Sequence, residues 1–206
     1  MRDSNPTVII PSHRPELARE AGRSMAPVEP MYQFNKGYPS FSKLINDCIL
    51  ACPTEIVIIC NDKARPIPFH EYFTAALVRQ GYGFVGLHNF RHFGFHKDLI
   101  RRIGFFDERY EGGEYEDFDF LRRIKEANIA VYLSREIPCM ELACSWNNQK
   151  SYIFNHQKWK EYGTHTVRIL PDEPLKYDIG SSQGTVWKPY RESVLLSPNM
   201  PKEFAL

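Results

Sequence analysis

The segment Glu55–Cys60, EIVIIC, constrains the fold of this chain more than any other stretch of the sequence. It follows Pro53 and precedes the polar triplet Asn61-Asp62-Lys63, and every residue after Glu55 is apolar. A strand that is apolar on both faces must be covered on both faces, which is typical of the parallel sheets of α/β proteins. The segment therefore predicts a buried strand in a sheet with helices on both sides.

Strand and helix patterns alternate along the first 135 residues. We expect strands at 7–10, 55–60, 83–87 and 129–133, and helices at 15–23, 40–52, 69–80, 97–103 and 118–128. Pro11 is expected to end the first strand, and Ser40 to cap the helix that follows it. The alternation predicts a single α/β domain with a Rossmann-like, mixed but mostly parallel sheet flanked by helices.

Polar segments follow two of these strands. Pro11-Ser12-His13-Arg14 comes after the first strand, and Asn61-Asp62-Lys63 comes after the EIVIIC strand. In open α/β sheets, ligands bind outside the carboxyl ends of the strands. Both segments are therefore candidates for ligand binding.

Composition excludes several other classes of protein. The chain has 206 residues, of which 43% are hydrophobic and 25% charged, as expected of a globular domain rather than a disordered or coiled-coil chain. Its net charge of +1 argues against a nucleic-acid-binding protein, which usually carries a basic excess. The five cysteines form no CxxC pair, and the sequence contains neither a signal-peptide core nor an apolar stretch of membrane-spanning length. We therefore expect a cytoplasmic protein with no nucleic-acid partner and no membrane span.

The segment Tyr110–Arg123, YEGGEYEDFDFLRR, carries the densest concentration of reactive side chains. Two glycines are followed by a helical pattern, and the acids of the segment are Glu111, Glu114, Glu116, Asp117 and Asp119. One interpretation is that the acids stabilise the positive end of the helix. Another is that clustered carboxylates raise one another's pKa, which suits a general base. The residues alone leave both interpretations open.

The order of these segments resembles the nucleotide-sugar-dependent glycosyltransferases of the GT-A fold. VIIPSHRPE resembles the first strand and loop of that family, and SKLIN followed by TEIVIICNDKARP resembles its helix, strand and acidic DXD region. The most specific piece is GFHKDLIRRIGFFDERYEGGEYEDFDFLRRI at 94–124, which is similar to the acceptor-side segment of family-2-like enzymes and β-1,4-galactosyltransferases. NHQKWKEYG at 155–163 resembles a downstream segment of some of these enzymes.

The resemblance implies transfer of a hexosyl or pentosyl group from a nucleoside-diphosphate sugar, most often a UDP-sugar, to a hydroxyl of a glycan or small acceptor. It implies an inverting reaction with Asp117 as the general base and Glu116 beside it. The acceptor would contact Trp146 and Gly113, and the nucleotide sugar would contact Pro11, Ser12, His13, Arg14, Asn35, Lys43, Asn61 and Lys63. A retaining mechanism, which would not need Asp117 as a base, is the nearest variant.

The expected metal site departs from the pattern of the family. Its acidic triplet reads Asn61-Asp62-Lys63 here, so Asp62 is the one anionic ligand that the triplet offers. One interpretation is that Asp62 holds Mn²⁺ or Mg²⁺ with the help of the diphosphate, water and a later histidine, His156 or His165. The alternative is that Lys63 replaces part of the metal's charge and no metal is needed. The family also has a carboxylate for the base and ribose, and Glu29 is the only acid between Arg23 and Asn35.

Two other functions compete with the transferase. A non-catalytic module that binds nucleotides or sugars on the same fold is favoured by the altered triplet, and a nucleotidyltransferase is opposed by the lack of glycine in PSHRPELARE. We expect the GT-A-like domain to cover residues 1–170. The segment 171–206, rich in Pro, Gly and Ser, is expected to be an extension that packs on this domain or serves as a lid, a dimer contact or a linker.

Overall fold

The computed structural model describes residues 5–34, 40–110, 115–134 and 137. These residues form β1 (Thr7–Ser12), α1 (Pro15–Ser24), β2 (Met31–Phe34), α2 (Phe41–Ala51), β3 (Ile56–Cys60), α3 (His70–Arg79), β4 (Phe84–Phe90), β5 (His92–His96), α4 (Asp98–Ile103), α5 (Glu116–Glu126) and β6 (Val131–Leu133). None of the described helices is both long enough and apolar enough to span a bilayer. The predicted extension at 171–206 lies outside the described residues.

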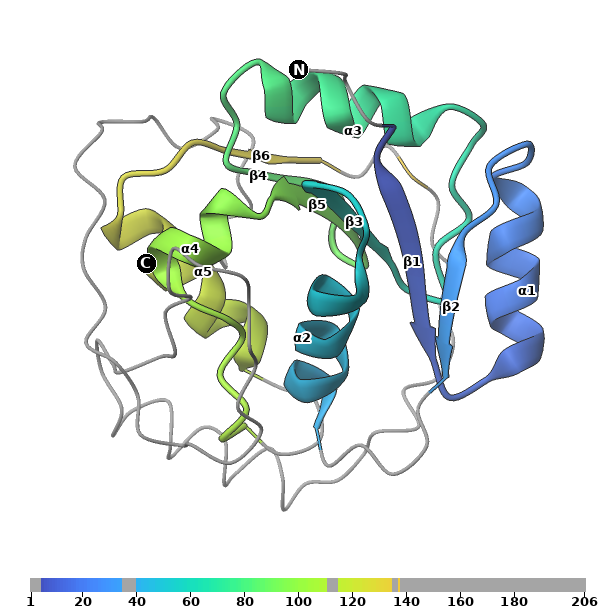
Figure 1. The fold of residues 1–206 in the computed structure, drawn as a ribbon, viewed down its shortest axis with the longest axis horizontal. Helices are drawn as coiled ribbons and strands as arrows, with labels where there is room; N and C mark the ends of the chain where they lie inside the picture. Colours follow the sequence, from blue (N-terminus) through green and yellow to red (C-terminus); the bar gives the residue numbers. More distant parts are fainter. Residues whose placement is uncertain (1–4, 35–39, 111–114, 135–136, 138–206) are drawn as a thin grey trace.

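The strands form one sheet in the order β2-β1-β3-β5-β4-β6 (Figure 1). β1 is parallel to β2 and β3, β5 is antiparallel to β3 and β4, and β6 is parallel to β4. Every strand except β5 therefore runs in the same direction. This confirms the prediction of an α/β domain with a mixed, mostly parallel sheet flanked by helices.

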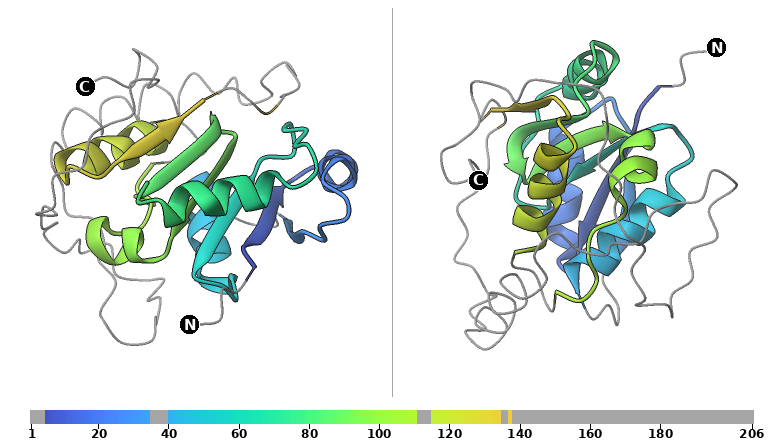
Figure 2. Two further views of the ribbon diagram at one scale, coloured as in Figure 1. Left: turned by 90° about the horizontal axis from the view of Figure 1, so that it is seen from above. Right: turned by 90° about the vertical axis from the view of Figure 1, so that its left-hand side faces the viewer.

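Apolar side chains fill both faces of the sheet. On one face the core lies against α2, α4 and α5, and on the other a second core lies against α1 and α3 (Figure 2). Every residue of β3 is buried, as the EIVIIC segment predicts. Because alternate residues of a strand point to opposite faces, Val57 and Ile59 enter the first core, while Ile58 and Cys60 enter the second.

The observed elements lie close to their predicted ranges, with one informative difference in β1. α2 begins after Ser40, whose hydroxyl accepts a hydrogen bond from the backbone N–H of Lys43 at 3.2 Å, which confirms the predicted cap. β1, however, continues through Pro11 to Ser12 beside β2. Its pairing with β3 ends at Ile9, so Pro11 lies past that partner, where a residue without an N–H is tolerated.

Two strands, β2 and β5, are missing from the sequence-based prediction. β2 lies at the edge of the described sheet, and its four residues, MYQF, are too few to show an alternating or an unbroken apolar pattern. β5 sends Phe93 and Phe95 into the core beside α2, while Gly94 faces Thr74 of α3. The sequence of β5, HFGFH, alternates with a period of two, but it is short and has at its centre a glycine, which is depleted in strands.

Candidate functional site

The chain reverses its path across the sheet between β1 and β3. From β1, α1 leads outward to β2, and α2 then brings the chain back past β1 to β3 on the other side. The two helices pack against opposite faces of the sheet. The carboxyl ends of β1 and β3 therefore flank a topological switch point, which is where open α/β sheets bind their ligands.

The loop after β1 is fixed by Ser12. Its hydroxyl accepts the backbone N–H of Arg14 at 2.8 Å and donates to Oδ2 of Asp62 at 2.6 Å. Ser12 is buried at the last position of β1, whereas the neighbouring His13 is exposed. One side chain thus orients the backbone that carries Arg14 and holds the carboxylate that follows β3.

Arg14 and Asp62 form a two-point ion pair across the switch point. Nε of Arg14 donates to Oδ2 of Asp62 at 3.0 Å, and Nη2 donates to Oδ1. The Asp62 side chain is 4% exposed and the Arg14 side chain 25% exposed, so the carboxylate is covered while the guanidinium reaches the surface. Paired hydrogen bonds of this kind fix both the distance and the plane of the two groups.

The residues beside Asp62 form a tight turn at the end of β3. Oδ1 of Asn61 accepts the backbone N–H of Lys63 at 2.9 Å, and the N–H of Asn61 donates to the carbonyl of Arg91 at 2.7 Å. The second bond joins the end of β3 to the turn between β4 and β5. Arg65 donates to the carbonyl of Asp62 at 2.8 Å, which further restrains the turn. Lys63 is half-buried and makes no side-chain hydrogen bond or ion pair with other described residues.

Glu116 and Asp117 lie in the first turn of α5. Glu116 is 7% exposed, and Oδ1 of Asp117 accepts the backbone N–H of Phe118 at 2.9 Å. Tyr115, just before the helix, has a left-handed backbone with φ of 71°. This conformation is unusual for a residue other than glycine, and such residues cluster at functional sites. α2 and α5 both begin at the end of the sheet where the carboxyl end of β1 lies (Figures 1 and 2).

Asp119 has a structural role that the sequence does not separate from the roles of the other acids. It is fully buried and accepts a hydrogen bond from Nε of Arg123 at 2.9 Å, and Nη1 of Arg123 in turn donates to the carbonyl of Ile103 at 2.6 Å. This ion pair joins α5 to the end of α4. Part of the acid-rich segment therefore stabilises the fold, while Glu116 and Asp117 remain as the chemical candidates.

Asn46, which sequence analysis did not single out, anchors the segment that leads to α5. Its side-chain amide donates to the carbonyl of Phe106 at 2.9 Å, and its side-chain oxygen accepts the N–H of Phe106 at 3.0 Å. The same amide also donates to Glu108 at 2.9 Å. Because Asn46 belongs to α2, these bonds hold the segment that leads to α5 against α2. Both helices begin at the same end of the sheet (Figures 1 and 2).

Three buried polar side chains lie together near the carboxyl end of β3, and the sequence does not predict their contact. The rings of His70 and His92 meet at 4.6 Å between centroids, and Glu71 lies beside His70, with 3.4 Å between its Oε2 and the His70 Nδ1. Burial lowers the pKa of His70 to about 4 and that of His92 well below its usual value, and it raises the pKa of Glu71. The residues come from α3 and β5, and no local motif links them, so the sequence offers no signal for the cluster.

The structure brings some predicted site residues together and places others elsewhere. Ser12, Arg14 and Asp62 are in direct contact, with His13, Asn61 and Lys63 next to them in the chain and Pro11 buried in β1. Lys43 lies in the first turn of α2, where it pairs with Asp47 at 3.2 Å. The remaining predicted contacts lie outside the described residues: Asn35, Gly113, Trp146 and His156.

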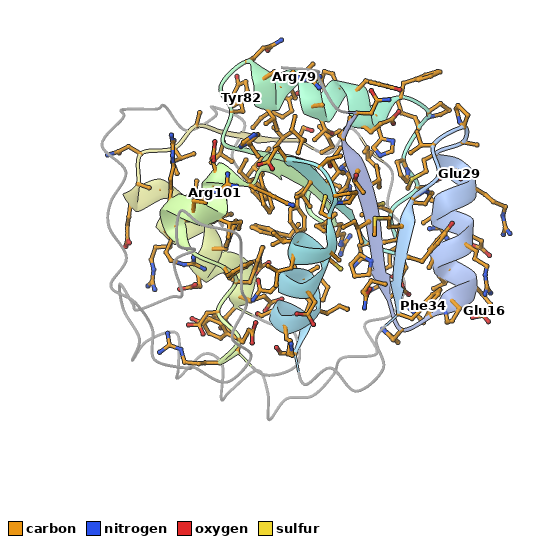
Figure 3. The ribbon with its side chains drawn as sticks, viewed as in Figure 1. Glu16, Glu29, Phe34, Arg79, Tyr82 and Arg101 are labelled. Carbon is orange, nitrogen blue, oxygen red and sulfur yellow. The ribbon has the colours of Figure 1, made fainter. Side chains whose placement is uncertain are left out.

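Glu29 is separated from this cluster by the length of β2. It is exposed and precedes β2, whereas Phe34 ends that strand and pairs in register with Ser12. Figure 3 shows Glu29 and Phe34 toward opposite ends of β2. Phe34 also stacks with Tyr32, with 6.2 Å between ring centroids. An aromatic side chain rather than a carboxylate therefore lies beside the switch point on this strand.

The contacts of Asp62 fit a divalent cation poorly. Its Oδ2 already accepts two hydrogen bonds and its Oδ1 accepts one, so a cation at Oδ1 would lie beside the Arg14 guanidinium, which repels it. Among residues 5–34, 40–110, 115–134 and 137, no three His, Cys, Asp or Glu side chains gather as a metal-binding group. With His156 outside this range, the Mn²⁺ or Mg²⁺ ion stays a prediction.

The chain matches no protein-family model, and no curated protein matches its sequence.

Proposed function

We propose that the chain is a nucleotide-sugar-dependent glycosyltransferase of the GT-A type, which transfers a sugar from a nucleoside diphosphate, UDP in the first instance, to a hydroxyl acceptor. One observation carries the proposal: the cluster of Ser12, Arg14 and Asp62 lies at the switch point of the sheet. Both segments that resemble the donor-binding loops of that family meet there.

The chemistry of this cluster suits the donor. Arg14 and Lys63 bring positive charge to the ends of β1 and β3, where a diphosphate would be neutralised as it leaves. Phe34 adds an aromatic face one strand away, suited to stacking on a nucleobase. These groups come from three adjacent parallel strands, so the sheet itself sets their spacing.

The first turn of α5 supplies the acid–base group of the proposed reaction. The Asp117 carboxylate lies at a helix N-terminus, where negative charge is stabilised. In the transfer, Asp117 takes the proton of the acceptor hydroxyl as the hydroxyl oxygen attacks the anomeric carbon. The bond from that carbon to the diphosphate breaks, its electron pair leaves with the nucleoside diphosphate, and the anomeric configuration inverts.

The first test is binding and turnover with a panel of nucleoside diphosphates and their sugars. A nucleotide at 100 times its dissociation constant adds about 2.7 kcal/mol to the free energy of unfolding, which thermal denaturation detects readily. We expect one nucleoside diphosphate to stabilise the chain, and its sugar to release that nucleotide when glycan acceptors are added. If no nucleotide stabilises the chain, the proposal is wrong.

Asp117→Asn separates chemistry from binding. We expect the variant to bind the nucleotide like the wild type and to lose roughly 10²- to 10⁴-fold in the rate of transfer, because it lacks a base. Asp98→Asn is the matched control, because Asp98 is 53% exposed on α4 and pairs with Arg101. Full activity of Asp117→Asn would indicate the retaining variant. Binding without turnover would indicate a binding module, and pyrophosphate release from a nucleoside triphosphate would indicate a nucleotidyltransferase.

A further inference from the structure

The Arg14–Asp62 pair raises the question of what neutralises the diphosphate. In the predicted metal-dependent site, Asp62 would hold a divalent cation. In the structure its two oxygens instead face the guanidinium of Arg14 and the hydroxyl of Ser12. We propose that Arg14, held by Asp62 and Ser12, is the positive group that binds the diphosphate, and that the chain binds nucleoside diphosphates without a divalent cation. The inference rests on the proposed function and specifies how its donor site works.

The guanidinium has an edge to offer to a second anion. Arg14 uses the edge formed by Nε and Nη2 for Asp62, which leaves Nη1 and the outer N–H of Nη2 for another pair of oxygens. Those donors have no hydrogen bond to other described residues, and the side chain is 25% exposed. Planar two-point recognition of phosphate is the interaction for which arginine is best suited.

The position of Arg14 is set in advance by its neighbours. Ser12 fixes the Arg14 backbone through its N–H at 2.8 Å, and Asp62 fixes the plane of the guanidinium. Asp62 is itself held by Ser12 at 2.6 Å and by the turn in which Arg65 bonds its carbonyl. A donor held in this way loses little conformational entropy when the anion binds, so each hydrogen bond contributes more to the affinity.

Local charge also disfavours a metal ion. Arg14 balances the charge of Asp62, and Lys63 adds a further positive charge at the next position along the chain. A divalent cation at Asp62 would lie beside the positive Arg14 guanidinium in a partly buried site. A diphosphate meets the opposite field and is attracted by the same groups.

The decisive measurement is calorimetric titration of the full chain with UDP, GDP and TDP, each in excess EDTA and in MnCl₂. We expect one nucleotide to bind with affinities that differ by less than about twofold between the two conditions. Binding that appears only with MnCl₂ would overturn the inference and leave the proposed function intact. Absence of binding by every nucleotide in both conditions would overturn the proposed function, and the inference with it.

Variants test whether Arg14 is the group responsible. Arg14→Gln should weaken nucleotide binding in EDTA by roughly ten- to a hundredfold, the loss expected for charged hydrogen bonds. Arg19→Gln is the matched control, because Arg19 is exposed on α1 and carries the same charge. Unchanged affinity of a folded Arg14→Gln variant would overturn the inference and would show that the ion pair only stabilises the packing of β1 against β3. If Arg14→Gln does not fold, the comparison of EDTA with MnCl₂ on the wild-type chain still decides.

Discussion

At the scale of single residues, the buried histidines make the chain sensitive to acid. Burial holds the pKa of His70 at about 4 and that of His92 well below 6.5, whereas an unfolded chain takes up these protons near 6.5. Below that pH the unfolded state binds more protons than the folded state, so the free energy of unfolding falls as pH falls from 6.5 towards 4. His70 alone accounts for a loss on the order of 3 kcal/mol. The raised pKa of Glu71 acts in the opposite sense and offsets part of it.

Urea denaturation at pH 7.5, 6.0 and 5.0 measures this loss. We expect the double variant His70→Gln/His92→Gln to flatten the dependence of the unfolding free energy on pH. His13→Gln is the control, because it removes a histidine from an exposed position and leaves the buried cluster intact. An equally steep slope in the double variant would assign the acid sensitivity to other groups.

Residue-level prediction from the sequence succeeds where a residue's role is local. Ser40 caps α2 because serine and the following helical pattern are adjacent in the chain. Arg14 and Asp62 were each singled out by their place after a strand, but their ion pair joins residues 48 positions apart. That contact depends on the register of β1 against β3, which no local pattern encodes. The same reason hides the cluster of His70, Glu71 and His92.

At the scale of elements, Gly94 sets how closely α3 approaches the sheet. A Cβ at this position of β5 would lie 2.7 Å from Cγ2 of Thr74 and 3.0 Å from Cγ1 of Ile58. Gly94→Ala should therefore lower the free energy of unfolding by about 1–3 kcal/mol, the usual range for overpacking a core. Chemical denaturation gives this value directly.

A second substitution shows whether the contact with α3 is responsible. Thr74→Ser removes the methyl group that the new Cβ would meet and keeps the hydroxyl that donates to the His70 carbonyl at 3.0 Å. In the Thr74→Ser background, Gly94→Ala should lower the free energy of unfolding by less than it does in the wild type. If Gly94→Ala lowers the free energy of unfolding equally in both backgrounds, the strain lies in the contact of the new Cβ with Ile58 or with the Val57 carbonyl.

Elements are predictable from the sequence to the extent that burial gives them a pattern. β3 is buried on both faces and appears as an unbroken apolar run, and α2 has a continuous apolar face. β2 is an edge strand of four residues with two of them exposed, which is too short a stretch to show a burial pattern. β5 alternates in HFGFH, but the stretch is only five residues long and has a glycine at its centre, which weakens the strand pattern.

At the scale of the whole molecule, protection of backbone amides should follow the order of the strands. β3 and β5 lie in the middle of the sheet with partners on both sides, whereas β2 lies at its edge and, among the described strands, pairs with β1 alone. We expect amides of β3 to exchange with solvent only on global unfolding, and amides of β2 to exchange by local opening. Hydrogen–deuterium exchange with mass spectrometry measures both. Equal protection of β2 and β3 would contradict this picture of the sheet.

The reversed strand β5 also affects how the chain folds as it is synthesised. β1, β2 and β3 leave the ribosome before β5, so the edge of β3 that does not pair with β1 stays unpaired until β5 has been made and has folded back against it. An apolar strand with an unpaired edge is a site at which other chains can add. The nascent protein therefore passes through an interval in which β3, the strand that ends fully buried, is exposed to pairing with other chains and to aggregation. Within the described sheet, that interval ends when β5 pairs with β3.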